Sequence, residues 1–296
     1  MSTGTLGAPA PGMAPVARRR PGAMRRALRT AALVAFALAF LFPFYYMLIG
    51  SLQTEPDTSP AGAFPTGGLT LDNYREIDAE INLLRSLVNS GIFTGGVILG
   101  TLVFGLLAGY ALAQLSFRGR GALFGLVLLV QVVPFQLLLI PLYVLIVRGY
   151  GLADSYLGMI LPFAINTTAV FVFRQFFLQL PADLFAAARL DGASELRILW
   201  SVALPLVRPA LLTVVLLTFI GPWNEFLWPF LITKQTDMQP LAVSLANYLS
   251  TVAARATNPY GAILAGACVL AAPAVALFVA FQRHFISSNI GSGVKG

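Results

Sequence analysis

The stretch PADLFAAARLDGASELRILWSVALPLVRPAL, residues 181–211, decides the fold of this chain because it separates two long apolar regions. Pro181 fits the first turn of a helix, where no amide donor is lost. Asp183 suits the positive end of that helix. The pair Asp191–Gly192 then breaks the helix, since glycine readily adopts positive φ, and Ser194 can cap a second helix. The stretch is therefore predicted to form two short helices rather than an open loop.

The first of these short helices is expected to present a face of small side chains. Leu184, Ala187 and Ala188 share one side of it at helical spacing. The pair Leu204–Pro205 marks the entry into the next apolar segment. A short helix held between two membrane spans suits a docking element for a cytoplasmic partner. An amphipathic helix that only lies on lipid has the same shape, so shape alone leaves both interpretations open.

The composition of the whole chain indicates a membrane protein. Of its 296 residues, 57% are hydrophobic and 10% are charged, and the mean hydropathy is +0.80. A soluble domain carries roughly 25% charged residues. An ordinary soluble enzyme, a disordered protein and a nucleic-acid binder are therefore excluded. The single cysteine, Cys268, rules out a disulfide framework, and the single histidine, His284, argues against the common zinc sites.

Windows without charged residues define the expected membrane spans. A helix needs about 20 mostly apolar residues to cross the bilayer core. The fold class is predicted to be all-α and polytopic, with six transmembrane helices. We place these helices at 30–51, 87–114, 121–146, 155–178, 206–231 and 260–284. Pro134 and Pro141 are expected to kink the third helix. Glycines four residues apart in the second helix are expected to allow close packing; they are Gly91 and Gly95, Gly96 and Gly100, and Gly105 and Gly109.

The distribution of Arg and Lys predicts the orientation of these spans. Most of the 19 basic residues fall on one side if the N-terminus is cytoplasmic and the spans alternate, as the positive-inside rule requires. Both termini are then cytoplasmic. The first apolar run is too long for a signal peptide, so we expect a retained anchor. The expected layout is a disordered basic cytoplasmic tail at 1–29, a first transmembrane helix at 30–51, an extracytoplasmic loop at 52–85, a core at 86–286 that contains the cytoplasmic loop 181–206, and a cytoplasmic tail at 287–296.

Two of the expected outer segments have distinct sequences. The string LTLDNYREI, which begins at Leu69, is polar and is predicted to form a short helix. The segment 232–259 is long and low in charge. We expect this segment to be an adaptable loop.

Polar side chains inside the expected spans are candidates for a solute pathway. Glu225 is the one charge well within a span, and Trp223 and Asn224 lie beside it. An indole can stack on a sugar ring, and amides and carboxylates bond sugar hydroxyls. An anchor at the membrane interface or a hydrogen bond between helices would account for the same residues. Arg174 is expected to extend its charge toward the interface. Weaker pathway candidates are Gln131, Asn166, Thr167 and Thr168.

The stretch 181–211 resembles the EAA loop of binding-protein-dependent ABC transporter permeases. That pattern runs from a proline through Glu-Ala-Ala and Asp-Gly-Ala to Leu-Pro. The residues that match it in type and spacing are Ala187, Ala188, Asp191, Gly192, Ala193, Leu204 and Pro205. The glutamate of the pattern is replaced by Ala186, which puts in doubt a salt bridge from that position to the ATPase. Glu195 and Asp183 are the acids that could compensate.

Other strings extend the resemblance over about residues 30–296, toward the carbohydrate-uptake branch of the family. They are LTLDNYREI from Leu69, RSLVNS from Arg85, QLLLIPLYVLI from Gln136, VFRQFFLQLP from Val172, GPWNEFLWPFLI from Gly221 and the terminal GVKG. Together they are most similar to the MalG-like subunit, which is usually the second permease of a heterodimer. The resemblance therefore implies a MetI-like ABC importer permease fold.

The resemblance also implies a function and a set of partners. The chain would be a non-catalytic permease subunit, in the inner membrane of a bacterium, that imports a sugar, most simply a di- or oligosaccharide. The implied partners are a second homologous permease, two ATPase subunits that dock on the EAA loops of the two permeases (181–206 in this chain), an extracytoplasmic sugar-binding protein that meets 232–259, and membrane lipid. No nucleic acid is expected. ATP and Mg would bind the ATPases, so no cofactor or metal is expected on this chain.

The main alternative is an ion-coupled secondary transporter for a small polar solute. Such a protein is typically built from repeats and carries buried acids or broken helices near the bilayer midplane. No repeat is evident, and Glu225 is the only acid available within a span.

Overall fold

The computed structural model describes residues 23–57, 59, 62, 64, 68–255 and 258–290, and for 23, 255 and 283–290 it describes the backbone only. Most of the described chain is helical, which confirms the all-α prediction. Most of the two expected tails lies outside the described residues.

In chain order the elements are α1 (Ala23–Leu52), α2 (Asp72–Ile81), α3 (Leu83–Gln114), α4 (Arg120–Val130), α5 (Phe135–Tyr143), η2 (Val144–Gly149), α6 (Tyr156–Ile160), η3 (Leu161–Phe163), α7 (Thr167–Leu178), α8 (Ala182–Leu190), α9 (Glu195–Ile198), η4 (Leu199–Ala203), α10 (Leu204–Leu206), α11 (Arg208–Asn224), α12 (Leu227–Ile232), η5 (Thr236–Met238), α13 (Leu241–Thr251), η6 (Ala253–Arg255) and α14 (Tyr260–Ile290).

The chain divides into two compact units, Met1–Tyr46 and Met47–Gly296. Most of α1 belongs to the first unit, and this helix begins at Ala23, earlier than the expected residue 30. The side chains of Phe36 and Phe40 are each 64% exposed. Apolar side chains exposed in this way suit a helix surrounded by lipid.

Helices that are candidates to cross a membrane occur in two forms among the described residues. Three helices are long and apolar enough to cross a membrane: Met24–Leu52, Leu83–Gln114 and Tyr260–Gln282. Three helix pairs pass the same test only together, because each is bent at a short break: Arg120–Val130 with Phe135–Gly149 by 92°, Tyr156–Phe163 with Thr167–Leu178 by 51°, and Glu195–Leu206 with Arg208–Asn224 by 81°. The kink expected at Pro134 in 121–146 is therefore confirmed, whereas the expectation of a continuous helix is wrong at 155–178, and at 206–231, where α11 ends at Asn224 and α12 begins at Leu227.

Local chemistry explains the breaks. Pro134 has extended backbone angles (φ −61°, ψ 130°) and begins α5; it also lacks an amide hydrogen for a preceding helical turn. The side chain of Asn166 accepts a hydrogen bond from the amide of Ala169 and so begins α7. Pro209 occupies the first turn of α11, where proline is tolerated. Pro141, by contrast, lies inside α5, so only one of the two expected proline kinks ends a helix.

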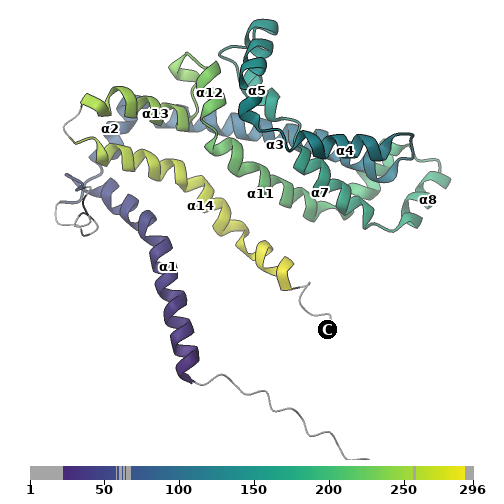
Figure 1. Cartoon of the computed structure of the whole chain (residues 1–296), viewed down its shortest axis with the longest axis horizontal. Coiled ribbons are helices and arrows are strands. Elements are labelled where there is room, and N and C mark those ends of the chain that lie inside the picture. The colour runs from purple at the N-terminus through teal and green to yellow at the C-terminus, as the bar shows by residue number, and fades with distance from the viewer. Residues whose placement is uncertain are drawn as a thin grey trace, which may run out of the picture. The chain divides into compact units, whose positions relative to one another are not determined.

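Helix α3 lies at the centre of the second unit, side by side with α7 and α11 (Figure 1). Glycine makes this approach possible, because a Cβ atom on Gly109 would lie 2.6 Å from the Cβ of Phe173 in α7. The predicted close packing through glycine is confirmed at this position. Gly91 and Gly95 differ, since a Cβ atom on either would meet nothing within 4 Å.

The segment 232–259 is more ordered than the adaptable loop we expected. Helix α13 occupies most of it and buries Leu241, Val243 and Tyr248. Helix α2, which confirms the short helix predicted after Leu69, packs against α13 and α14. Figure 1 places α2 and α13 at one end of α3 and α8 at the opposite end.

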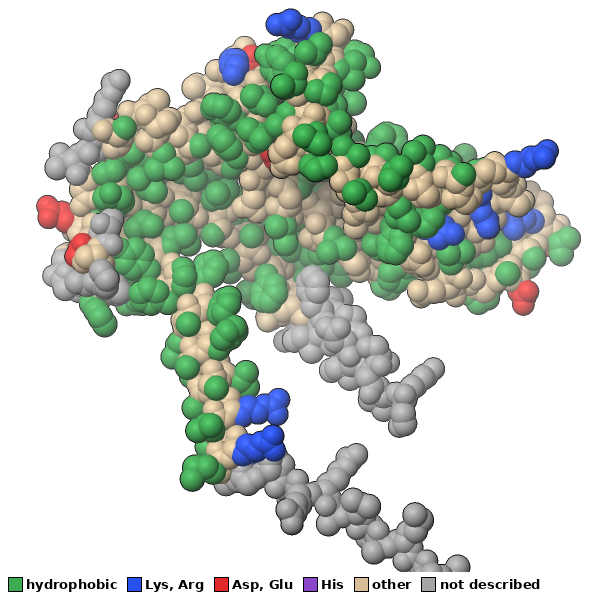
Figure 2. All heavy atoms as spheres, viewed as in Figure 1, with side chains coloured by type: hydrophobic (Ala, Val, Ile, Leu, Met, Phe, Trp, Pro, Cys, Tyr) green, Lys and Arg blue, Asp and Glu red, His purple; other side chains and the backbone are tan. Residues whose placement is uncertain are grey.

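The surface of the second unit is mainly apolar. Figure 2 shows hydrophobic side chains over much of the visible face, with Lys and Arg side chains gathered at the end where α8 lies. Leu137 of α5 is 71% exposed, and Ile140 is 79% exposed. Such a surface suits lipid rather than water, because a lipid environment removes the exposed apolar side chains from contact with water.

Candidate functional site

The segment 181–206 folds as two short helices, as the sequence predicts. Pro181 precedes α8 as its cap residue, one position earlier than the first turn. Gly192 separates α8 from α9 with φ +78°, a left-handed conformation that glycine adopts freely. Ser194 caps α9, because its side-chain oxygen accepts a hydrogen bond from the amide of Arg197. The two helices are thus joined by a turn that depends on one glycine.

Helix α8 is attached to the body of the protein on one side and free on the other. Phe185 is 1% exposed and lies with its ring 6.3 Å from the ring of Tyr110 in α3. Leu190 is 88% exposed. The expected face of small residues is split, because Ala187 is exposed whereas Ala188 packs partly against the core. Of the other residues matched to the EAA pattern, Ala193 and Leu204 are half-buried, and Asp191, Gly192 and Pro205 are exposed.

A cluster of Tyr110, Arg189 and Glu195, here called the Glu195 cluster, joins this segment to α3. The hydroxyl of Tyr110 donates to Oε2 of Glu195 at 2.6 Å. Nε of Arg189 donates to Oε1 of Glu195 at 2.7 Å. This hydrogen bond raises the pKa of the Arg189 guanidinium. The sequence showed the acid but not its partner in α3, which is distant along the chain.

A second feature is a hollow of about 340 Å³ between the broken helices, here called the Glu225 hollow. It brings together four of the seven pathway candidates: Gln131, Asn166, Thr167 and Glu225. Thr168 lies next to it and accepts a hydrogen bond from Nε2 of Gln131 at 2.8 Å. The remaining lining residues are Val97, Val130, Val133, Pro162, Phe163, Ile165, Leu217, Thr218, Gly221 and Pro222.

Trp223 and Asn224 do not line the Glu225 hollow. The indole N–H of Trp223 donates to the carbonyl of Leu270 in α14 at 2.9 Å, and the side chain is 6% exposed. Nδ2 of Asn224 donates to the carbonyl of Ile220, within its own helix. In this structure, Trp223 fixes α11 to α14. A hydrogen bond between helices was one of the alternative interpretations that the sequence allowed for these residues.

Glu225 itself has a structural role at the edge of the hollow. Its Oε1 accepts hydrogen bonds from the amides of Leu227 at 3.0 Å and Trp228 at 3.2 Å, so it caps the start of α12. Thr218 also lines the hollow and was not singled out from the sequence. The spacing of Thr218, Gly221 and Glu225 is that of one helix face, so helical periodicity would have found it.

Arg174, expected to extend toward the membrane interface, is held instead by neighbouring helices. Its guanidinium carbon lies 4.0 Å from the ring centroid of Phe124 in α4. Its Nε donates to the carbonyl of Leu112 in α3 at 3.3 Å. A cation over an aromatic ring is attracted by the charge distribution of the ring. Arg174 therefore helps to join α7 to α3 and α4.

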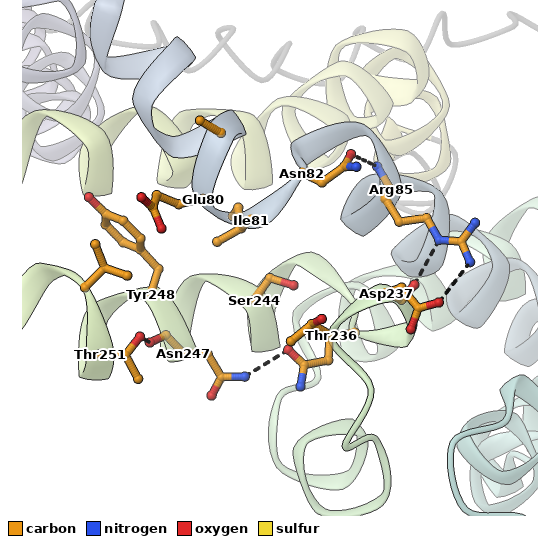
Figure 3. Close-up of a pocket in the computed structure, with 13 residues that line it drawn as sticks. Glu80, Ile81, Asn82, Arg85, Thr236, Asp237, Ser244, Asn247, Tyr248 and Thr251 are labelled. Atoms are coloured by element: carbon orange, nitrogen blue, oxygen red, sulfur yellow. Dashed lines mark hydrogen bonds and ion pairs between the residues drawn. The ribbon is translucent and has the colours of Figure 1, made fainter.

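A third feature is a pocket of about 370 Å³ where α2 meets α3 and α13, here called the α2–α13 pocket (Figure 3). Arg85 lines it on one side, and its Nε donates to the carbonyl of Asp237 at 2.9 Å. Nδ2 of Asn247 donates to Oε1 of Gln239 at 2.9 Å. Burial and the nearby carboxylate of Glu76 raise the pKa of Tyr248 to about 12, so its hydroxyl is neutral at physiological pH.

Asn89 holds this end of α3 to its surroundings. The side chain is fully buried, and Nδ2 donates to the carbonyls of Asp237 at 2.9 Å and Gln239 at 3.0 Å. Its Oδ1 accepts from the hydroxyl of Tyr156 at 2.6 Å. One amide thus joins three segments that are far apart in the sequence.

Replacing Asn89 with alanine is expected to destabilise the protein by roughly 3 kcal/mol, because a fully buried side chain loses three hydrogen bonds and the buried residue Gln239 loses this partner of its carbonyl. The measurement is the midpoint of thermal unfolding of the purified protein in detergent. Asn247→Ala is the matched control, since it removes one hydrogen bond at a half-buried side chain. If the two variants lowered the thermal midpoint equally, Asn89 would not be the residue that mainly holds this end of α3 to the neighbouring segments.

Comparisons with known proteins agree on one family. The family described as "Binding-protein-dependent transport system inner membrane component" matches residues 101–288. The arabinooligosaccharides transport system permease protein AraQ of Bacillus subtilis (strain 168) is 36% identical over 274 residues, covering 88% of this chain and 92% of that protein. The sn-glycerol-3-phosphate transport system permease protein UgpE of Agrobacterium fabrum (strain C58) is 30% identical over 267 residues, covering 87% and 93%.

The solved structures add a similarity in fold. A chain of a bacterial ABC transporter involved in the import of the acidic polysaccharide alginate superposes with a TM-score of 0.76, covering 93% of this chain and 100% of that one. The two are 23% identical, so this likeness concerns the fold alone. The family match and the long alignments with the relatives lead to one conclusion: the chain belongs to the inner membrane components of binding-protein-dependent transport systems.

Proposed function

We propose that this chain is a permease subunit of an ABC importer for a sugar, and that it works with a second homologous permease. The observation that carries the proposal is the 36% identity to an arabinooligosaccharide permease over 92% of that protein's length. In this proposal the bent pairs α4–α5 and α6–α7 are one span each, α11 is the fifth span, and 181–206 lies outside the membrane. Together with α1, α3 and α14 this gives six crossings with both termini in the cytoplasm. The gathering of Lys and Arg at the α8 end supports that orientation (Figure 2).

The Glu225 hollow favours a neutral di- or oligosaccharide over a phosphorylated solute. Its polar lining consists of Gln131, Asn166, Thr167, Thr218 and Glu225, and no Lys or Arg is among its described lining residues. Amide and hydroxyl groups can bond sugar hydroxyls, whereas a phosphate prefers basic partners. One carboxylate would repel a phosphate. Trp223 and Asn224 would act on the pathway only by positioning the helix that bears Glu225.

The segment 181–206 is this chain's proposed attachment site for the ATPase pair, which would also dock on the corresponding loop of the second permease. Its exposed surface at Leu184, Ala187 and Leu190 is free of charge and suits a groove on a partner protein. ATP and Mg would bind the ATPases, so this chain contributes docking and movement rather than catalysis. Movement of rigid helices between two states would carry the energy of ATP binding to the pathway.

The α2–α13 pocket lies at the opposite end of α3 and faces outward in this orientation (Figure 1). We propose that this end, including the segment 232–259, meets the extracytoplasmic sugar-binding protein. The three broken helices would also suit an ion-coupled transporter. Membership in the binding-protein-dependent family favours the ATP-driven importer.

Gly192→Val tests the attachment of the ATPase. Valine is disfavoured at φ +78° by about 1–2 kcal/mol, so the turn between α8 and α9 should change. We expect the variant to insert into the membrane but to lose ATPase co-purification and sugar uptake; Asp191→Ala, in the same turn, should weaken both. Gly121→Val is the control, because a Cβ atom there meets nothing within 4 Å.

Normal uptake by both turn variants would count against the docking role. A native chain that purifies from its own membrane without an ATPase or a second permease would overturn the proposed function as a whole.

A further inference from the structure

Helix α3 is placed to connect the two ends of the protein. It runs without a break over Leu83–Gln114, which is 32 residues. At about 1.5 Å per residue, such a helix is roughly 48 Å long. One end carries Arg85 and Asn89, which bond the segment around Asp237. The other end carries Tyr110 of the Glu195 cluster.

The carboxylate of Glu195 bonds residues of two other helices at once. Oε1 accepts from Nε of Arg189 at 2.7 Å, and Oε2 accepts from the hydroxyl of Tyr110 at 2.6 Å. Nη2 of Arg189 also reaches Oε2 of Glu195 and the carbonyl of Gln114, each at 3.3 Å. The cluster therefore ties α8 and α9 to the last turns of α3 through the side chains of Arg189, Glu195 and Tyr110 and the carbonyl of Gln114.

The bond from Tyr110 is the strong part of the cluster. Tyr110 is 4% exposed, and its ring packs against the ring of Phe177 with centroids 5.4 Å apart. A buried hydroxyl needs an acceptor, and a hydrogen bond to a carboxylate is about twice as strong as a neutral one. The side chains of Arg189 and Glu195 are 40% and 39% exposed, so their ion pair alone contributes little.

We propose that the Glu195 cluster is a latch that makes α3 follow every movement of the segment 181–206. This inference rests on the proposed function, since the movement originates in the ATPase. Tyr110 and Glu195 are positioning residues in this scheme and touch neither sugar nor nucleotide. With the latch intact, a shift of α8 moves α3 and, through it, the Arg85–Asp237 contact at the far end. When the cluster is broken, α8 still moves, but α3 and the pathway no longer move with it.

The test uses the complete transporter, reconstituted in liposomes with its ATPase, second permease and binding protein. The quantity measured is sugar transported per ATP hydrolysed. Tyr110→Phe keeps the buried ring and removes only the hydroxyl. We expect ATPase co-purification and ATP hydrolysis to persist, while sugar per ATP falls by about tenfold, the size expected when a hydrogen bond to a charged group is lost.

Two further variants make the result specific. Tyr150→Phe is the matched control, because Tyr150 is 59% exposed and lies in the turn after η2; its sugar per ATP should equal that of the native protein. Glu195→Gln should lower the ratio as well. The double variant of Tyr110 and Glu195 should be no worse than the more severe single one, as expected for residues that act through one contact.

An unchanged ratio in Tyr110→Phe would overturn the latch, and so would a parallel fall of transport and hydrolysis, which indicates damage to the structure. Additive effects in the double variant would also overturn it. Failure of the native complex to couple hydrolysis to uptake would instead overturn the proposed function.

Discussion

Gly109→Val is expected to destabilise the whole protein strongly and to lower its thermal midpoint. A Cβ atom at this position would lie 2.6 Å from the Cβ of Phe173 and 3.0 Å from the backbone nitrogen of Arg174. Backbone cannot move aside as a flexible side chain can, and valine adds two methyl groups beyond Cβ. Overpacking costs typically about 1–3 kcal/mol, and occasionally more; we expect the upper end here, because α3 packs extensively on α7.

The measurement is the yield of monodisperse protein after extraction in detergent, together with its thermal midpoint. Gly95→Val is the control, because Gly95 lies in the same helix and a Cβ atom there meets nothing within 4 Å. The control should behave as the native protein does. If both variants are extracted equally well, the close approach of α3 and α7 is not as the structure describes.

These two glycines show how far sequence spacing predicts helix packing. The spacing of four residues identified α3 as a helix with a close neighbour, and this is confirmed at Gly109. Spacing did not distinguish Gly109 from Gly95, because both belong to pairs of the same kind. The difference lies in which side of α3 meets α7, and that depends on residues elsewhere in the chain.

The broken helices show a second limit of the sequence. Windows without charge measure how much apolar chain is available, and they predicted the apolar regions correctly. They do not register direction: Pro134 predicted the bend of 92°, but the bends of 51° and 81° were not expected. The local signals were present in the prolines Pro134 and Pro209 and in the cap residue Asn166. Each of these residues restricts or caps the backbone within one turn, and the change in direction follows.

The proposed pathway residues divide according to helix geometry. Trp223 and Asn224 end α11, and successive residues of a helix point in directions about 100° apart. Glu225 follows with an extended backbone (φ −68°, ψ 122°) and so leaves the helical path. One of the three reaches the Glu225 hollow, while Trp223 reaches α14. Gln131, Asn166 and Thr167 come from other segments and meet at the hollow because two helices are broken beside them. The polarity of their side chains identified these residues as candidates, but only the tertiary structure shows which of them line the Glu225 hollow.

Phe185→Ala should detach α8 from the body of the protein and abolish coupled uptake. Phe185 is 1% exposed and packs in the cluster formed with Tyr110, Phe177 and Ile198. Removing a buried phenylalanine side chain costs about 3–5 kcal/mol. This cost falls on a helix of nine residues that is otherwise held by the Glu195 cluster. We therefore expect local release of α8 while the spans remain folded.

Limited proteolysis of the purified protein measures this release directly, and sugar uptake measures its consequence. The Phe185→Ala variant should be cleaved within 181–195 under conditions that leave the native chain intact, and its thermal midpoint should fall less than that of Gly109→Val. Leu190→Ala is the matched control, because Leu190 lies in the same helix and is 88% exposed; its protease resistance should be native. Protease resistance of the Phe185 variant would show that α8 does not depend on this anchor, and the attachment would then have to reside in the contacts of Glu195.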